Sequence, residues 1–286
     1  AATAMTVRLL FAGLVLAYAL LITPFTSYMK NRPVEVKLGY LPHPQILKAV
    51  AGEHRPSIAG FMMMRVLFYF GTIIEKLQEN VIVRPEFYNM YKNLQGIVHI
   101  DPQNADAYYF VQAAYTWELG RIQEVNHLLK QGMTARPRDF WLPFYIGFNY
   151  AYFLQEYQSA APYMQRAAEL SGNPLFANLA ARYFYESQQN SFGLAFLETM
   201  IQSAKDKAVK KTYEMRRDAL LAVETIKQAV EAYKASVGVM PHDLQDLTRS
   251  GHLTELPRDP YGGTFYLDEQ GQVRTTSKFS QMLGEG

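Results

Sequence analysis

A regular spacing of prolines in the middle of the chain constrains its fold more than any other feature. Pro102, Pro137 and Pro174 lie 35 and 37 residues apart. Each is followed by an aromatic-rich stretch, a short polar break and a second apolar stretch. Because proline cannot continue a helix that precedes it, the pattern predicts successive units of helix, turn and helix.

The polar breaks repeat with a similar spacing. They read LGRIQ from residue 119, LQEYQ from residue 154 and SQQNS from residue 187. A period near 34 residues, built from helix, turn and helix, is the signature of tetratricopeptide repeats, and residues 85–205 resemble that family. The resemblance implies an α-solenoid whose concave face binds peptides, helices or partner subunits. Only the first break contains glycine, Gly120, so the number of repeats is either two or three. A plain helical bundle with an accidental spacing is the alternative.

Six tyrosines in the first helices of these units are candidates for a partner-binding surface. They are Tyr108, Tyr109, Tyr115, Tyr145, Tyr150 and Tyr183. The alternative is that they pack between helices, because stacked helix pairs bury aromatic side chains of this kind.

An uncharged stretch near the N-terminus predicts a membrane anchor. Residues 9–25 carry no charge over 17 positions, and the run reaches 20 residues if it extends to Tyr28. A helix of about 20 apolar residues crosses the hydrocarbon core of a membrane. We therefore expect residues 1–32 to form the anchor and residues 9–28 to contact the membrane. A cleaved signal peptide, with Ala17 to Ala19 as its cleavage signal, is the alternative, although the apolar run continues beyond it.

The location of the body depends on the orientation of this anchor. Lys30, Arg32 and Lys37 follow the helix, which by the positive-inside rule favours a cytoplasmic body. The layout of a short tail, one helix and a long domain is typical of an exported protein, and the absence of cysteine fits an oxidising compartment. We therefore predict a single-span inner-membrane protein with its body in the periplasm.

A second hydrophobic stretch, residues 57–77, lies in a connecting helical segment that we place at residues 33–84. Arg65 stands in its middle, and an arginine at the centre of a bilayer is costly. The stretch is therefore predicted to be a buried or membrane-surface helix. Met62, Met63, Met64 and Phe68 are expected to be packing residues, with an adaptable partner-binding groove as the alternative.

Composition and motifs indicate no catalytic chemistry. The 28 basic and 26 acidic side chains leave a net charge of +2, which offers no broad field for nucleic acid. The lack of cysteine excludes thiolate metal sites and a cysteine nucleophile. Neither a P-loop, a dinucleotide fingerprint nor a nucleophile elbow occurs. We predict no enzyme activity, cofactor or metal, although His242 and His252 flank Asp243 and Asp246 and leave a loose metal site as an alternative. The two carboxylates fit helix capping better.

The last part of the chain, residues 206–286, changes character. A long helix over residues 210–241 is predicted to end near Gly238 and Pro241. A short helix follows, and the segment LPRDPYGGTFYLDEQGQV, residues 256–273, then predicts a hairpin with strands at residues 264–267 and 273–275.

This segment resembles the globular end of type II secretion major pseudopilins over residues 227–277. The resemblance rests on a helix end, a leucine pair and a hairpin motif that occur in the same order. Its most specific residues are Tyr233, Pro241, Asp259, Pro260, Tyr261, Gly262 and Gly263. It implies a helix laid on a small antiparallel sheet. The alternative is that RDPYGG is simply good turn chemistry, with Asp259 bonding the backbone of the turn.

Two features of pseudopilins are absent from this chain. The N-terminal region lacks their processing motif, and only TTSKFSQMLGEG follows the hairpin in place of the calcium loop. The resemblance therefore carries over a fold, and neither filament assembly nor calcium binding.

We expect a mostly α-helical protein with an N-terminal membrane helix, a tetratricopeptide-like α-solenoid and a small α+β module that caps it. The predicted function is a non-catalytic, membrane-anchored scaffold or accessory subunit whose partners are other proteins. One alternative is a component of a type II secretion or pilus-like apparatus. Another is an accessory subunit of a membrane transporter or respiratory enzyme complex.

Overall fold

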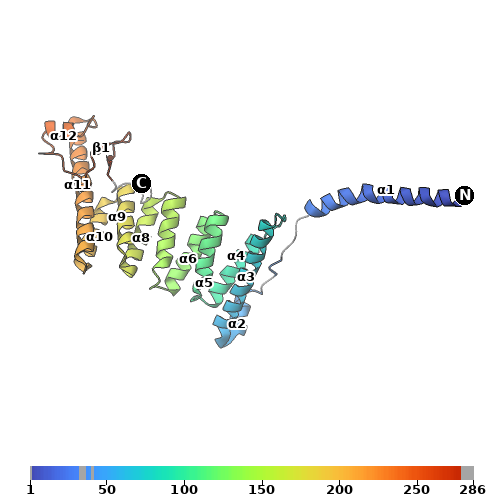
Figure 1. Ribbon diagram of the computed structural model, residues 1–286. Helices are drawn as coiled ribbons and strands as arrows, with labels where there is room; N and C mark the ends of the chain where they lie inside the picture. Colours follow the sequence, from blue (N-terminus) through green and yellow to red (C-terminus); the bar gives the residue numbers. More distant parts are fainter. Residues whose placement is uncertain (1, 32–36, 40–41, 278–286) are drawn as a thin grey trace. The chain divides into compact units, whose positions relative to one another are not determined.

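The computed structural model describes residues 2–31, 37–39 and 42–277. It consists of two compact units, Ala1–Val111 and Gln112–Gly286. The described residues are mostly helical, with an apolar helix near the N-terminus and a two-stranded antiparallel hairpin near the C-terminus (Figure 1). The predicted fold class, mostly α with a small helix-plus-hairpin module, is confirmed.

The first unit contains two hydrophobic helices. Its elements are α1 (Ala2–Asn31), α2 (Pro44–Ala51), the short 3₁₀ turn η1 (Gly52–His54), α3 (Arg55–Gln78), α4 (Phe87–Ile100) and most of α5 (Ala105–Ala113). Within α1, none of the 20 residues Leu10–Met29 is buried, and the stretch is long and apolar enough to cross a membrane. The stretch Gln45–Gln78 meets the same criterion of length and composition, but one third of it is buried inside the protein.

Helix α3 packs against α4 through one face only. Met62 and Met63 are buried there, as the sequence predicted, together with Val66 and Tyr69. The same prediction is wrong for Met64 and Phe68, which are exposed. These two side chains belong to a second apolar face, on the side of the helix turned away from the core.

The second unit is a series of antiparallel helices followed by the hairpin module. Its elements are η2 (Ala114–Glu118), α6 (Ile122–Ala135), α7 (Trp141–Phe148), η3 (Asn149–Phe153), α8 (Tyr157–Ser171), α9 (Pro174–Glu186), α10 (Asn190–Ser203), α11 (Lys207–Val237), α12 (Gln245–Arg249), β1 (Phe265–Leu267) and β2 (Val273–Thr275). Each helix from α6 to α11 contacts the next one along the chain (Figure 1). This is nearest-neighbour stacking, as in repeat proteins.

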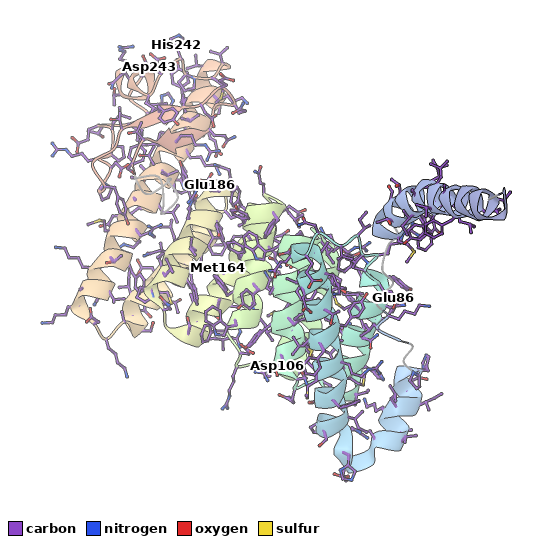
Figure 2. All side chains as sticks on the ribbon, turned by 45° about the vertical axis from the view of Figure 1, so that its right-hand side comes forward. Glu86, Asp106, Met164, Glu186, His242 and Asp243 are labelled. Carbon is purple, nitrogen blue, oxygen red and sulfur yellow. The ribbon has the colours of Figure 1, made fainter. Side chains whose placement is uncertain are left out.

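Small residues allow neighbouring helices to approach closely. Ala160, Ala161, Ala167 and Ala168 of α8 are fully buried. A Cβ atom added at Gly147 of α7 would lie 3.0 Å from the backbone nitrogen of Met164 and 3.2 Å from the Ala160 carbonyl oxygen. Met164 lies in the middle of the stack (Figure 2). The contact between α7 and α8 is therefore one of backbone against backbone.

A left-handed residue marks the turn inside each helix pair. Gly120, Gln155 and Gln188 have φ values of 61°, 54° and 60°, and they are spaced by 35 and 33 residues. Asn80 has φ 57° after α3 in the first unit. Such a residue reverses the chain at a helix end and lets the following N–H bond back to the last helical turn. All of the breaks predicted from the sequence thus adopt one geometry, although only one of them contains glycine.

Backbone hydrogen bonds close these turns in each case. The N–H of Arg121 donates to the Tyr115 carbonyl at 3.0 Å, and that of Glu156 donates to the Tyr150 carbonyl at 2.9 Å. The third turn is closed by the bond from Gln189 to Phe184 at 2.8 Å.

The hairpin module is attached to the helices by α11. Asp206 caps the start of α11 by accepting bonds from the N–H groups of Ala208 and Val209, and Gly238 ends it with φ 86°. Strand β1 pairs with β2 so that Tyr266 lies opposite Arg274. α11 packs against β2.

An ion pair connects the hairpin to α9. Arg274 Nη1 lies 2.9 Å from Glu186 Oε2 at the end of α9, and its guanidinium lies over the Tyr185 ring. The module thus covers part of the last helix pair.

The exchange Gly147→Ala should destabilise the protein by about 1–3 kcal/mol, because the added methyl group overpacks the contact between α7 and α8. The matched exchange Gly71→Ala, in α3, adds a methyl group with nothing within 4 Å. It should be neutral or stabilise by up to about 1 kcal/mol. Denaturant unfolding of both variants in detergent measures the difference, and equal effects would contradict the close packing.

Deletion of residues 240–286 should lower the melting temperature by about 5 °C or more, because it uncovers apolar surface of α11 and removes the Arg274–Glu186 pair. Solubility should fall as well. Differential scanning calorimetry measures this effect, and an unchanged melting temperature would show that the module does not cap the helices.

Candidate functional site: an exposed aromatic stripe

The second unit exposes a continuous row of aromatic side chains, which we call the aromatic stripe. Its members are Trp117, Trp141, Phe144, Tyr145, Phe148, Tyr152 and Phe153. Five of them, from Trp141 to Tyr152, recur at helical spacing along α7 and η3 and therefore share one face. Trp117, Trp141 and Tyr152 are 58%, 40% and 51% exposed. The other four are half-buried.

Ring contacts connect the stripe along its whole length. Trp141 stacks on Tyr145 at a centroid distance of 5.7 Å, and Phe148 stacks on Tyr152 at 5.2 Å with an interplanar angle of 9°. Trp117 comes from the preceding helix pair and lies 5.0 Å from Phe153 and 5.9 Å from Tyr152. Two consecutive helix pairs thus contribute to one surface, and the rings hold each other in place before any partner binds.

A buried amide network lies behind the stripe. Asn149, fully buried, exchanges two hydrogen bonds with Gln112, at 2.8 and 3.0 Å, and donates a third to Asn126 Oδ1 at 2.8 Å. Asn149 begins η3, and Gln112 lies just before η2. Asn126 Nδ2 is buried without a hydrogen-bond partner among the described residues. The three bonds of Asn149 still favour one arrangement of the helix segments that carry them.

Two π-helical turns shape the helix ends that carry Trp117 and Tyr152. The turns η2 and η3 begin at Ala114 and Asn149, 35 residues apart, which is also the spacing between Gly120 and Gln155. A π turn inserts one extra residue into a helix and is common at functional sites. Here it sets the direction of the aromatic side chains at the ends of the first helices of two pairs, the ones that carry Trp117 and Tyr152.

The six tyrosines predicted as partner-binding residues divide into two groups. Tyr108, Tyr115, Tyr150 and Tyr183 are buried, which assigns them to packing between helices. Tyr109 and Tyr145 are half-buried, and Tyr145 belongs to the aromatic stripe. Burial raises the pKa of Tyr183 to about 12, and burial together with the nearby Asp139 raises the pKa of Tyr145.

The strongest candidates on this surface were absent from the sequence prediction. Three of these side chains are more exposed than any of the six predicted tyrosines: Trp117, Trp141 and Tyr152. The fourth, Phe148, is half-buried and stacks on Tyr152. Their spacing of three to four residues along 141–152 was the available signal. The sequence did not distinguish that face from the buried one, because α7 is apolar on nearly all sides.

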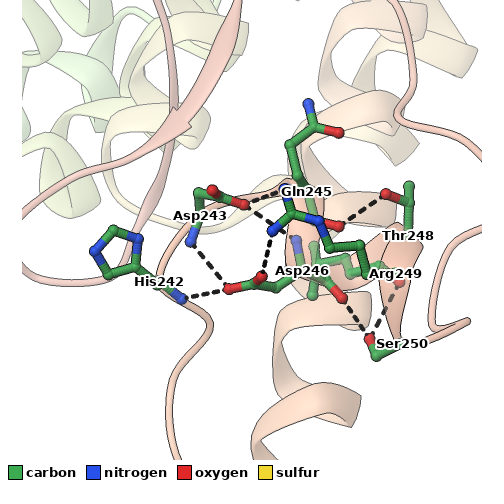
Figure 3. A network of polar contacts seen from close by, with 8 residues as sticks. His242, Asp243, Gln245, Asp246, Thr248, Arg249 and Ser250 are labelled. Carbon is green, nitrogen blue, oxygen red and sulfur yellow. Dashed lines mark hydrogen bonds and ion pairs between the residues drawn. The ribbon is translucent and has the colours of Figure 1, made fainter.

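The hairpin module contains Asp243 and Asp246, the two carboxylates of the metal site that the sequence allowed as an alternative. Asp243 Oδ1 accepts bonds from the N–H groups of Gln245 and Asp246, at 2.8 and 3.1 Å. Asp246 Oδ2 accepts from the N–H groups of His242 and Asp243, and its Oδ1 pairs with Arg249 at 3.1 Å (Figure 3). These bonds lower the pKa of Asp246. The two carboxylates cap α12 reciprocally, which is the structural role expected for them.

His252 likewise has partners for both ring nitrogens, Ser236 and Ser250, at 2.9 and 2.8 Å. In the part of the chain that the structure describes, no group of three or more histidine, aspartate or glutamate side chains could hold a metal ion. A cavity of about 630 Å³ lies between α12 and β1, and its lining includes His242, Asp243 and Tyr266. The carboxylate of Asp243 lines this cavity and already accepts the two capping hydrogen bonds from Gln245 and Asp246.

The residues of the pseudopilin-like motif form the turn before β1. Asp259 accepts a bond from the N–H of Tyr261 at 2.8 Å and a second, short bond from the hydroxyl of Thr275. Gly262 has φ 79°. A Cβ atom at Gly263 would lie 2.6 Å from the backbone nitrogen of Ser277, so this position accepts no side chain.

The remaining motif residues frame this turn. Pro241 is buried, Pro260 is exposed, and the half-buried ring of Tyr233 contacts His252. Asp259 therefore bonds the turn, as the turn-chemistry alternative expects.

Comparisons with known proteins leave the family open: no family model matches the chain, and no curated protein matches its sequence.

The raised pKa of Tyr183 predicts a loss of stability at high pH. A tyrosine in the unfolded chain ionises near pH 10, whereas folded Tyr183 keeps its proton to about pH 12. Its contribution is therefore constant below pH 10. It falls by about 2–3 kcal/mol between pH 10 and 12, where the unfolded chain has lost a proton that the folded chain retains. The Tyr183→Phe variant should show a smaller decline in unfolding free energy over this range. Parallel curves for the two proteins would contradict this assignment.

Proposed function

We propose that this protein is a non-catalytic, membrane-anchored scaffold or accessory subunit that binds a partner protein through the aromatic stripe. The observation that carries the proposal is the exposure of Trp117, Trp141 and Tyr152 on a rigid, two-helix-pair surface. Contiguous exposed apolar surface of this kind is typical of interaction sites. Tryptophan and tyrosine are also the residues that contribute most to binding at protein interfaces.

The dimensions of the stripe favour a helical partner segment. From Trp141 to Tyr152 it extends for about 16 Å at the rise of a helix, which matches about three turns of a partner helix. A row of rings without charged side chains between them is complementary to the apolar face of an amphipathic helix. A tetratricopeptide-like assignment of the helix pairs agrees with this mode of binding and belongs to the same proposal.

The location is also part of the proposal. Helix α1 would anchor the chain in the inner membrane by a single span, with the body in the periplasm. Support comes from the apolar stretch Leu10–Met29, none of which is buried, and from the absence of cysteine. The anchor would restrict the stripe to partners that share the membrane.

A role in a secretion or pilus-like apparatus is the second candidate, and the packing of α11 on the hairpin favours it. This arrangement is what the pseudopilin resemblance implies for residues 227–277. In that case the partners that co-purify with the chain would be secretion or pilus subunits. Recovery with a transporter or respiratory complex would instead support an accessory subunit.

Affinity capture from native membranes in mild detergent tests the proposal. The unaltered chain should recover a stoichiometric partner. The double variant Trp141→Ala, Tyr152→Ala should recover at least about tenfold less, because hot-spot aromatic residues each contribute 2 kcal/mol or more.

A matched control is available on other helices of the same unit. Leu175 and Phe192 are also exposed but lie outside the stripe. The double variant Leu175→Ala, Phe192→Ala should recover the partner like the unaltered chain. Equal recovery by the two double variants would contradict binding through the stripe.

A further inference from the structure

Helix α3 of the first unit is apolar on two opposite faces. The inner face is buried and includes Met62, Val66, Tyr69 and Ile73. The outer face, which we call the α3 outer face, consists of Phe61, Met64, Leu67 and Phe68, which are 64%, 51%, 46% and 69% exposed. At about 100° per residue, the centres of the two sets lie on opposite sides of the helix.

This pattern is unusual for a helix in water. A surface helix of a globular protein carries polar residues on the face opposite its core. Here that face carries two phenylalanines, a methionine and a leucine within eight positions. Contact with water disfavours such an apolar surface, and a contiguous patch of this kind is typical of a site that contacts a protein or a membrane.

The polar contacts of α3 make a transmembrane position of this helix costly. Arg65, in its middle, donates a hydrogen bond from Nη2 to the carbonyl of Leu38 at 2.6 Å. The N–H of Leu38 in turn donates to Glu86 Oε2 at 3.1 Å, and the N–H of Glu86 bonds to the Tyr69 hydroxyl. These hydrogen bonds join the centre of α3 to the segments that contain Leu38 and Glu86. If α3 crossed the membrane, these segments and their charged side chains would also lie in the hydrocarbon core, which is costly. Lipid can therefore reach only the outer face.

The connection to α1 limits how far α3 lies from the membrane that α1 would cross. Residues 32–43 separate α1 from α2, and twelve residues reach at most about 40 Å whatever their conformation. Helix α2 and the short turn η1 then lead directly into α3.

The charge of this region is complementary to an anionic lipid surface. Between residues 30 and 55 the chain carries five basic and two acidic side chains. The basic residues are Lys30, Arg32, Lys37, Lys48 and Arg55. Basic residues close in sequence to an exposed apolar helix face favour contact of that face with an anionic membrane surface.

We propose that the α3 outer face lies in the headgroup region of the anionic membrane that holds α1, with Phe61, Met64 and Phe68 inserted between lipids. The inference rests on the proposed anchoring through α1. The first unit would then be held at two places, by a spanning helix and by an interfacial helix. The orientation of the body relative to the membrane would be fixed by their combination.

The test uses the chain of residues 1–286 in nanodiscs that contain anionic lipid. Because the chain has no cysteine, single cysteines can be labelled specifically. A fluorophore sensitive to its surroundings is attached at Phe68→Cys. Lipids brominated along their acyl chains should remove about half of its emission or more, as expected for a side chain at an interfacial depth of about 5–10 Å. Aqueous iodide should have little effect on it.

Tyr88→Cys is the matched control. Tyr88 is 69% exposed, as Phe68 is, but it lies on α4 beside Lys92, whose ammonium group lies over its ring. A label at this position should be quenched by iodide and not by brominated lipid.

A third label, at Leu16→Cys in α1, separates this inference from the proposed anchor. Lipid quenching at Leu16 with iodide quenching at Phe68 would overturn the contact of α3 and leave the anchor intact. Iodide quenching at both positions would overturn the anchor as well. Protection of Phe68 from both quenchers would mean that a protein, a second copy or a partner, covers the face, and would equally overturn the lipid contact.

Discussion

The structure depends on the tight chain reversal that follows each first helix. Gly120, Gln155 and Gln188 adopt left-handed conformations there, and a backbone hydrogen bond returns to the last helical turn in each case. An L-residue other than glycine costs about 1–2 kcal/mol in this conformation, so two of the three reversals are imposed by packing and not by the turn residue. This packing uses alanines and Gly147, which bring neighbouring helices to backbone contact.

The aromatic stripe follows from the same constraint. Once the small residues of α7 and α8 occupy the interface between helices, the bulky rings of α7 are directed away from it. The amide network around Asn149 then fixes the helix ends from which Trp117 and Tyr152 project. A surface built in this way is rigid before binding, which lowers the entropy lost when a partner binds.

Much of the fold could be predicted from the sequence, and less of the site. Proline spacing and the polar breaks identified the helix pairs, and RDPYGG identified the hairpin, because proline, glycine and aspartate act through local backbone chemistry. The choice among aromatic residues depends instead on which face of an almost wholly apolar helix is covered. Tyr150 and Tyr152 are two residues apart, which places them on opposite sides of a helix, so one is buried and the other is exposed. The residues around them do not show which of the two sides faces the core. Phe68 and Tyr69 of α3 differ in the same way.

Site-specific photo-crosslinking in cells tests the central claim, that the aromatic stripe is a docking surface, most directly. A benzophenone amino acid at Tyr152 should form one discrete adduct with a membrane-associated protein, whereas the same amino acid at Phe192, which is exposed outside the stripe, should not. Adducts at Phe192 and none at Tyr152 would contradict the account and place the interaction surface elsewhere on the helices.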